Sequence, residues 1–257
     1  MRGLYAIDVG PREAPAVAWL GSLGSTVRMW DRQLAELQPR CRCVLIDLPG
    51  HGGSRGASAP SSIAGLAGAV IGELDRLGLA RVHLVGTSIG AMIAMQVAVA
   101  HSGRVGRLAL LCTSAQLGPP SAWHDRAATV RADGAGAVAD AVVARWLTPA
   151  YAARHPDEVA ELVAMVASSE PEGYASCCEA IAAMNLRSDL AAITTPTLVI
   201  AGRQDPATPP EHGELIASLI PGAVVELVDA AHLASWERAA AVNALLRDHL
   251  LGGEGGG

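Results

Sequence analysis

The segment from residue 82 to residue 100 constrains the fold of this chain more than any other feature. An apolar run at 82–85 is followed by G-T-S-I-G at 86–90 and then by ten residues, 91–100, without a helix breaker. A strand, a G-x-S-x-G turn and a helix in direct succession predict a nucleophile elbow, in which the central serine sits in strained backbone with its hydroxyl exposed. Side chains at Gly86 and Gly90 would collide where strand and helix cross. Ser88 is therefore the candidate nucleophile, and a glycine-rich turn that matches by coincidence is the disfavoured alternative.

Strands and helices alternate on both sides of this segment. Runs such as 43–47, which is apolar up to its final aspartate, are typical of strands inside a parallel sheet. Further strands are predicted at 4–8, 16–20, 107–112, 195–202 and 223–228, and helices at 30–37, 63–77, 210–220 and 236–251. The first two strands, separated by a turn at 10–15, are expected to form a hairpin. The alternation predicts an α/β fold with a doubly wound, mostly parallel sheet and helices on both faces.

The alternation stops at Gly118-Pro119-Pro120, and only helical patterns follow until about residue 190. These patterns cover approximately 123–131, 135–147, 156–168 and 172–184. We therefore predict a core formed by residues 1–117 and 191–251, with a helical cap inserted at 118–190. The glycine-rich end, 252–257, is expected to be a flexible tail, either a linker or a frayed end.

Composition narrows the class of protein. The chain has 257 residues, of which 51% are hydrophobic and 17% charged, which is ample for a packed core. A net charge of −6 argues against nucleic-acid binding. Five cysteines without a C-x-x-C pair favour free thiols in a reducing compartment over disulfides or zinc. No leader-like or membrane-spanning apolar segment is found. We expect a cytoplasmic protein without a membrane partner, metal or cofactor.

A serine nucleophile needs a base, and the base needs a carboxylate to orient it. In this kind of sheet the chain order is serine, acid, histidine, and the acid and base lie on loops at the carboxyl ends of strands. Asp205 and His232 follow the strands at 195–202 and 223–228. Asp229 is the rival acid, although it directly ends a strand and is expected to hydrogen-bond its own loop. Among the other histidines, His51 lies in a turn, where a structural hydrogen bond is its expected role.

The oxyanion that forms during acyl transfer needs two preorganised donors. One is expected to be the backbone amide of Ile89, directly after the nucleophile. The other is expected from the turn after the strand at 16–20, where Leu23 is best placed. An ordinary glycine turn is the alternative interpretation of that segment.

With these features the chain resembles the α/β-hydrolase fold family and, within it, the β-ketoadipate (3-oxoadipate) enol-lactone hydrolases. The matching stretches in the core are S-L-G-S at 22–25, M-W-D at 29–31, G-H-G-G-S at 50–54, the elbow, P-T-L-V-I-A-G at 196–202, D-P-A-T-P-P at 205–210 and A-A-H-L at 230–233. Those in the cap are A-R-W-L-T-P at 144–149 and P-E-G-Y-A-S-C-C-E-A-I at 171–181. The cap segment around E-G-Y-A-S-C-C is the most specific of these.

The resemblance implies that Ser88 opens a small carboxylated lactone, most closely 3-oxoadipate enol-lactone, through an acyl-enzyme. His232 would take the serine proton and then protonate the enol oxygen that leaves. A cap cation would orient the substrate carboxylate, with Arg126, Arg131 and Arg145 as candidates. Trp123 and Trp146 would form apolar walls; the alternative is that these arginines lie on solvated helix faces. Relatives in the same pathway also suggest fusion to, or partnership with, a decarboxylase, and a homo-oligomer is left open.

Other activities would use the same three residues. The sequence departs from the enol-lactone hydrolase pattern at Gly21, Ile89, Ala91 and 234–236, near the expected pocket. Another esterase, lactonase or carbon–carbon bond hydrolase, including one in a biosynthetic pathway, is therefore the alternative, as is a cofactor-free haloperoxidase-like activity. A non-catalytic binding module would be expected to lack one of the three residues, and all are present.

Overall fold

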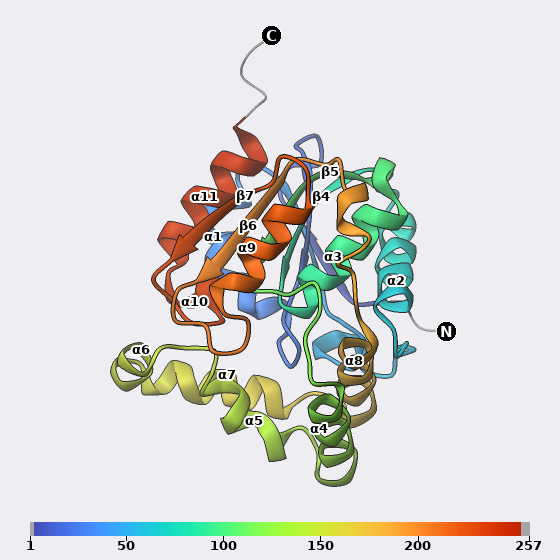
Figure 1. The fold of residues 1–257 in the computed structure, drawn as a ribbon. Coiled ribbons are helices and arrows are strands. Elements are labelled where there is room, and N and C mark those ends of the chain that lie inside the picture. Colours follow the sequence, from blue (N-terminus) through green and yellow to red (C-terminus); the bar gives the residue numbers. More distant parts are fainter. Residues whose placement is uncertain (1–2, 253–257) are drawn as a thin grey trace.

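Seven strands form one sheet in the order β1-β3-β2-β4-β5-β6-β7 (Figure 1). The structure is a computed structural model and describes residues 3–252. The strands are β1 (Ala6–Val9), β2 (Ala16–Leu20), β3 (Arg42–Ile46), β4 (Val82–Thr87), β5 (Val105–Leu111), β6 (Thr197–Gly202) and β7 (Val224–Val228). All neighbouring pairs are parallel except β1 and β3. The predicted α/β fold with a mostly parallel sheet is confirmed.

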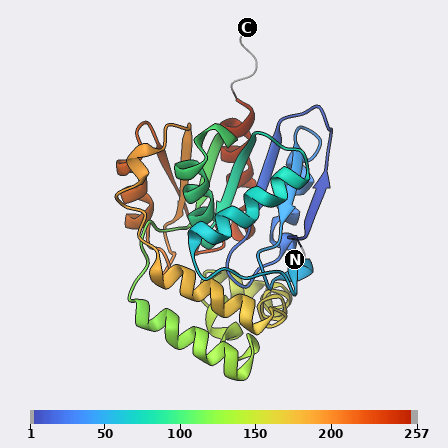
Figure 2. The same ribbon diagram turned by 90° about the vertical axis from the view of Figure 1, so that its right-hand side faces the viewer.

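Helices cover both faces of this sheet. The core helices are α1 (Asp31–Leu37), α2 (Ile63–Arg76), α3 (Ile89–Ala100), α9 (Pro210–Leu219), α10 (Ala234–Glu237) and α11 (Ala239–Leu251). Helices α2, α3 and α9 pack on one face, and α1, α10 and α11 pack on the other (Figures 1 and 2). Short 3₁₀ helices lie at Val27–Trp30, Gly52–Ser54, Ser102–Arg104 and Leu190–Ala192. Within residues 3–252, no helix is both long and apolar enough to cross a membrane.

The expected hairpin of the first two strands is wrong. Strand β3 lies between them, because it pairs antiparallel with β1 and parallel with β2. Residues 17–20 of β2 are buried, whereas all of β1 is only half-buried. An apolar strand such as β2 is covered best at the centre of the sheet, between β3 and β4, and the more polar β1 takes the edge.

Five helices lie together beyond one end of the sheet and form the predicted helical cap (Figures 1 and 2). They are α4 (Pro120–Asp133), α5 (Gly136–Val143), α6 (Pro149–Arg154), α7 (Pro156–Ala167) and α8 (Pro171–Ala183). The helix expected at 135–147 ends at Val143, and α6 follows as an unpredicted helix that starts with a proline. The domain limits at 118 and 190 stay a prediction. The predicted tail at 252–257 lies outside the described residues except for Gly252.

The parallel strands end side by side at the edge of the sheet that faces the cap. Thr87 of β4 is in register with Leu111 of β5, and Gly202 of β6 is in register with Val228 of β7. The segments that follow β2, β4, β6 and β7 therefore meet at one edge. This register brings residues from four distant parts of the chain to a single site.

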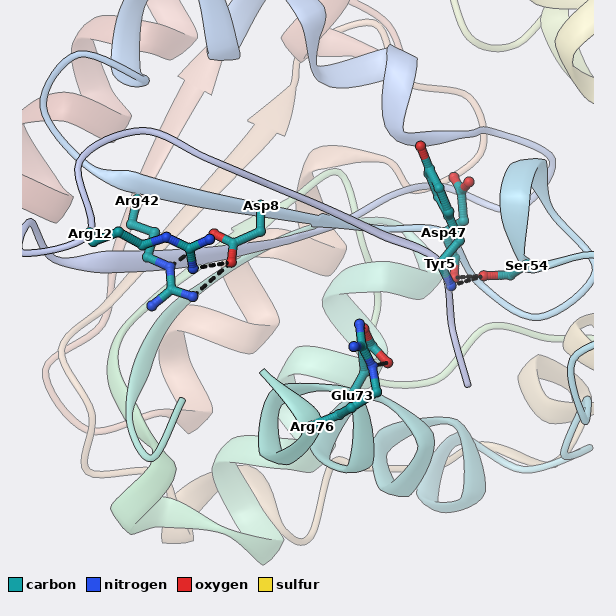
Figure 3. A network of polar contacts seen from close by, with 8 residues as sticks. All are labelled: Tyr5, Asp8, Arg12, Arg42, Asp47, Ser54, Glu73 and Arg76. Atoms are coloured by element: carbon teal, nitrogen blue, oxygen red, sulfur yellow. Dashed lines mark hydrogen bonds and ion pairs between the residues drawn. The ribbon is translucent and has the colours of Figure 1, made fainter. Parts of the chain in front are cut away.

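The antiparallel edge strand is held to its neighbour by a charge cluster (Figure 3). Arg42 of β3 donates two hydrogen bonds to the Asp8 carboxylate, at 2.9 and 2.7 Å, and Arg12 adds a third contact at 2.6 Å. The hydrogen bonds from Arg42 hold the pKa of Asp8 below its ordinary value, against the opposing effect of burial. The side chains of Asp8 and Arg42 are 13% and 12% exposed, so water screens this pair only in part.

We expect Asp8→Asn to lower the free energy of unfolding by about 1–3 kcal/mol at pH 7, because Arg42 loses a charged hydrogen-bond partner. Urea denaturation measures this loss. Since the folded-state pKa of Asp8 is depressed, its contribution is present above the unfolded pKa and disappears as pH falls through the folded value. The difference from wild type should therefore shrink below about pH 4. Asp75→Asn, which breaks a more exposed pair with Arg104, serves as control and should change stability by less than about 1 kcal/mol.

Candidate active site

Ser88 lies at the sharp turn between β4 and α3. Its φ of 56° and ψ of −120° are a backbone conformation that residues other than glycine rarely adopt. A Cβ on Gly86 would meet backbone atoms of Gly90 and Ala91, and a Cβ on Gly90 would meet the carbonyl of Leu20. The Ser88 amide donates to the carbonyl of Leu111 at 2.9 Å. The two glycines therefore have the steric role that the sequence predicts.

His232 and Asp205 meet at the same edge of the sheet. Nδ1 of His232 is 2.8 Å from Oδ2 of Asp205, and both side chains are buried. Since an ionised carboxylate only accepts hydrogen bonds, the imidazole proton lies on Nδ1. Nε2 is thereby left as an acceptor, the form that a general base requires. His232 also lines the same cavity as Ser88.

The Asp205 carboxylate stays ionised although it is buried. Burial by itself would raise its pKa, but the electrostatic attraction to His232, which is full when that ring is protonated, and the hydrogen bonds from His232 and Thr208 outweigh burial and lower it. Oδ1 accepts from the amides of Ala207 and Thr208 at 2.8 and 3.0 Å, and Oδ2 accepts from the Thr208 hydroxyl at 2.7 Å. A fixed negative charge behind the imidazole results.

Within residues 3–252, Asp229, the rival acid, forms neither a hydrogen bond nor an ion pair with His232. Its carboxylate is 65% exposed, accepts from Gln204 at 2.7 Å and lies 3.6 Å from Arg238. It hydrogen-bonds the loop around it, as the sequence suggests. The geometry therefore favours Asp205 as the acid.

Two backbone amides are free to bind an oxyanion. In the turn after β2, the amides of Ser22, Gly24 and Ser25 have acceptors in Met29, His51 and Ser22 respectively. Among the described residues, the Leu23 amide has none, and Leu23 lines the cavity. Ile89 is the first residue of α3, where an amide has no acceptor within its helix. Both predicted donors are therefore available.

These groups surround a cavity of about 250 Å³ between the sheet and the cap. The core contributes Ser22, Leu23, Ser88, Pro206, Ala207 and His232, and the cap contributes Trp123, Arg126, Val142, Arg145, Trp146 and Tyr174. The guanidinium of Arg126 lies over the Trp123 ring, 4.6 Å from its centre. Four of the five cap residues named as candidates for substrate binding thus lie in the cavity wall: Trp123, Arg126, Arg145 and Trp146.

The cavity carries positive charge that the described carboxylates do not neutralise by salt bridges. Neither Arg126 nor Arg145 forms an ion pair within residues 3–252. Burial and the charge of Arg126 lower the pKa of Arg145, against the opposing effects of Tyr174 and Asp205. Arg131, the third candidate, instead pairs with Glu172 and Glu179 at 2.8 and 2.6 Å, away from the cavity lining. A carboxylate in the cavity would relieve the repulsion between Arg126 and Arg145.

Three residues at the site escaped the sequence analysis. Thr208 holds the Asp205 carboxylate; an aspartate three residues before a threonine is a local signal that could have indicated this turn. Glu237 accepts from the Ala231 amide at 3.2 Å and from Thr148. Tyr174 lines the cavity, and burial raises the pKa of its hydroxyl against the opposing charge of Arg126. Only the tertiary fold places the last two.

The described residues hold no cluster of three or more histidine, cysteine, aspartate or glutamate side chains suited to a metal ion.

Comparison with known proteins agrees with this geometry. A model of the alpha/beta hydrolase family matches residues 18–245. The chain is 34% identical over 234 residues to 3-oxoadipate enol-lactonase 2 of Acinetobacter baylyi, covering 91% of this chain and 88% of the relative. It is 30% identical to a 2-hydroxy-6-oxononadienedioate/2-hydroxy-6-oxononatrienedioate hydrolase of Cupriavidus pinatubonensis, covering 81% and 76%. The crystal structure of an enol-lactonase from Burkholderia xenovorans LB400 superposes with a TM-score of 0.93 at 38% identity, covering 96% of each chain.

We expect Asp205→Asn to slow the labelling of Ser88 by a fluorophosphonate on the order of 10⁴-fold, as when the triad aspartate of a serine protease becomes asparagine. The new amide donates to Nδ1 and thus favours the tautomer in which Nε2 carries the proton. Labelling rates followed by mass spectrometry measure the loss. Asp229→Asn is the matched control and should label at the wild-type rate. If the two variants label equally fast, Asp205 is not the acid.

Proposed function

The chain belongs to the alpha/beta hydrolase family, and on that premise we propose that it opens a small carboxylated lactone through an acyl-enzyme on Ser88. Similarity to enol-lactonases favours 3-oxoadipate enol-lactone as the substrate. The observation that carries the proposal is the convergence in one cavity of Ser88, of His232 backed by the buried Asp205, and of two arginines that form no ion pair with a carboxylate of residues 3–252.

The first half of the reaction forms the acyl-enzyme. Nε2 of His232 takes the Ser88 proton while Oγ attacks the lactone carbonyl. The developing oxyanion accepts hydrogen bonds from the amides of Leu23 and Ile89. His232 then gives its proton to the enol oxygen as the ring opens. Asp205 stabilises the imidazolium during both transfers.

The second half releases the product. His232 takes a proton from water, which attacks the acyl carbon; the C–O bond to Ser88 then breaks as His232 returns the proton to Oγ, and this regenerates Ser88. The liberated enol tautomerises to a ketone, which draws the reaction forward. The substrate retains a carboxylate throughout, and Arg126 and Arg145 would hold it in the cavity, with Trp123 and Trp146 as apolar walls.

A different substrate is the second candidate. Similarity to a hydrolase of another named substrate supports a related esterase, lactonase or carbon–carbon bond hydrolase that uses the same three residues. A panel containing the enol-lactone, neutral lactones and a vinylogous diketone discriminates these activities. A cytoplasmic location stays a prediction from composition, and a role in aromatic catabolism and partnership with a decarboxylase stay predictions from the resemblance. A homo-oligomer stays open.

Ser88→Ala is expected to lower kcat for the muconolactone-derived enol-lactone on the order of a million-fold, because it removes the hydroxyl that forms the acyl-enzyme. The ultraviolet absorbance of the enol-lactone follows the reaction directly. Turnover by the alanine variant at a rate comparable with wild type would contradict the acyl-enzyme on Ser88.

Arg126→Ala and Arg145→Ala are expected to reduce kcat/KM for the carboxylated lactone by about 10- to 100-fold, since each removes a charged hydrogen-bond donor. Hydrolysis of p-nitrophenyl acetate, which has no carboxylate, should change by less than about 3-fold because it makes no such bond. Arg131→Ala, whose guanidinium pairs with glutamates instead, is the matched control and should leave the ratio of the two activities unchanged. Equal losses on both substrates would argue against a carboxylate site.

A further inference from the structure

His51 is a buried titratable side chain that the reaction proposed above does not use. It lies in the turn between β3 and the 3₁₀ helix at Gly52–Ser54, and it is 0% exposed. Both of its ring nitrogens make hydrogen bonds. Nδ1 lies 2.9 Å from the carbonyl oxygen of Pro49, and Nε2 lies 2.9 Å from the amide nitrogen of Gly24.

These two partners define the state of the ring. A carbonyl only accepts and an amide only donates, so Nδ1 carries the proton and Nε2 accepts from Gly24. Burial lowers the pKa of His51 against the opposing effect of backbone hydrogen bonds at Pro49 and Leu48, which favours the neutral ring. A protonated ring would turn Nε2 into a donor that faces another donor.

The turn that carries His51 is itself held firmly. The Asp47 carboxylate accepts from the amides of Gly53 and Val27, both at 2.7 Å, so one side chain joins this turn to the segment after Ser25. The Ser54 hydroxyl donates to the Asp47 carbonyl and accepts from the Tyr5 amide (Figure 3).

The cap supports the ring from the other side. The Tyr174 ring stacks on His51 with centroids 6.0 Å apart and planes inclined by 25°. Gly50 packs directly against Gly173 of α8, where a Cβ would come within 2.5 Å of the Gly173 Cα. His51 is thus a fixed support between α8 and the turn after β2.

The bonded amide belongs to the peptide that joins Leu23 to Gly24. Gly24 has a φ of +85°, and because glycine lacks a Cβ it can adopt a wider range of φ than other residues, so that its backbone alone restrains the orientation of this peptide only weakly. We propose that His51 is a positioning residue: it fixes this peptide and, through the Leu23 Cα that links it to the preceding Ser22–Leu23 peptide, helps to aim the Leu23 amide at the oxyanion. The inference rests on the proposed function, because the aim of that amide matters only when an acyl transfer takes place at Ser88.

Two isosteric variants separate the two hydrogen bonds of His51. The amide group of asparagine lies near the position of Nδ1, and that of glutamine lies near the position of Nε2. His51→Asn therefore can keep the bond to Pro49 and lose the one to Gly24. His51→Gln can keep an acceptor for Gly24 and lose the bond to Pro49. If His51 contributed only to stability, the glutamine variant would not be expected to have a higher kcat than the asparagine variant.

We expect His51→Asn to lower kcat for p-nitrophenyl acetate by about 10- to 100-fold and to change KM by less than about 2-fold. This loss in kcat is smaller than the roughly 10²–10³-fold loss that follows the removal of a whole oxyanion donor, because the Leu23 amide is still present. His51→Gln should recover most of kcat. Rates are expressed per Ser88 that a fluorophosphonate labels, so that an unfolded fraction does not enter. Equal kcat values in the two variants, whether at the wild-type level or below it, would overturn the proposal.

Wild type and Ser88→Ala, assayed alongside, separate this proposal from the proposed function. If Ser88→Ala retains turnover, the proposed acyl-enzyme is wrong. If Ser88→Ala is inactive but His51→Asn and His51→Gln have equal kcat values, only the positioning role of His51 is refuted. Nitrogen NMR of the wild-type imidazoles needs no variant to fold. We expect a His51 ring with a protonated Nδ1 and a bare Nε2 at neutral pH, and a protonated Nε2 would refute the hydrogen bond to Gly24.

Discussion

The close packing of the start of α3 against the ends of β4 and β2 is the contact on which the rest of the structure depends. Gly90 lies so near the carbonyl oxygens of Leu20 and Gly21 that no Cβ fits between them. This packing holds Ser88 at positive φ and presses the start of α3 against the turn after β2. The two backbone segments that carry the Leu23 and Ile89 amides are therefore packed against each other. Nucleophile and candidate oxyanion donors are positioned by one steric constraint.

The cap does more than enclose the cavity, because it is bonded to the loop that carries the base. The Leu233 amide donates to the carbonyl of Trp146 at 2.7 Å, directly after His232. The buried Glu237 carboxylate joins the Ala231 amide to Thr148 of the cap. The residues before and after His232 are thus tied to the segment that supplies a wall of the substrate cavity. Changes in the cap that alter specificity are consequently able to disturb the base as well.

Much of the fold and part of the site could be predicted because the signals are local. The glycine spacing at the elbow reflects contacts within a few residues, and the order of Ser88, Asp205 and His232 follows from strands that end at one edge. The choice among the cap arginines could not be predicted. Arg126 and Arg131 are five residues apart on α4, about 140° around the helix, so they point in different directions. Which of the two faces the cavity depends on how α4 packs against α8.

The sequence by itself determined an α/β sheet, an inserted cap, a strained serine and the two residues that meet behind it. The sheet, the cap and the strained serine follow from backbone sterics and from the period of apolar residues within short segments, and the pairing of Asp205 with His232 follows from the chain order expected of loops at one edge of the sheet. Only the tertiary structure decided that β3 separates the first two strands, that Glu237 supports the base loop and that His51 bonds to Gly24. Each of these rests on partners brought together by packing, and a hydrogen bond across 27 residues leaves no trace in the local pattern of either segment.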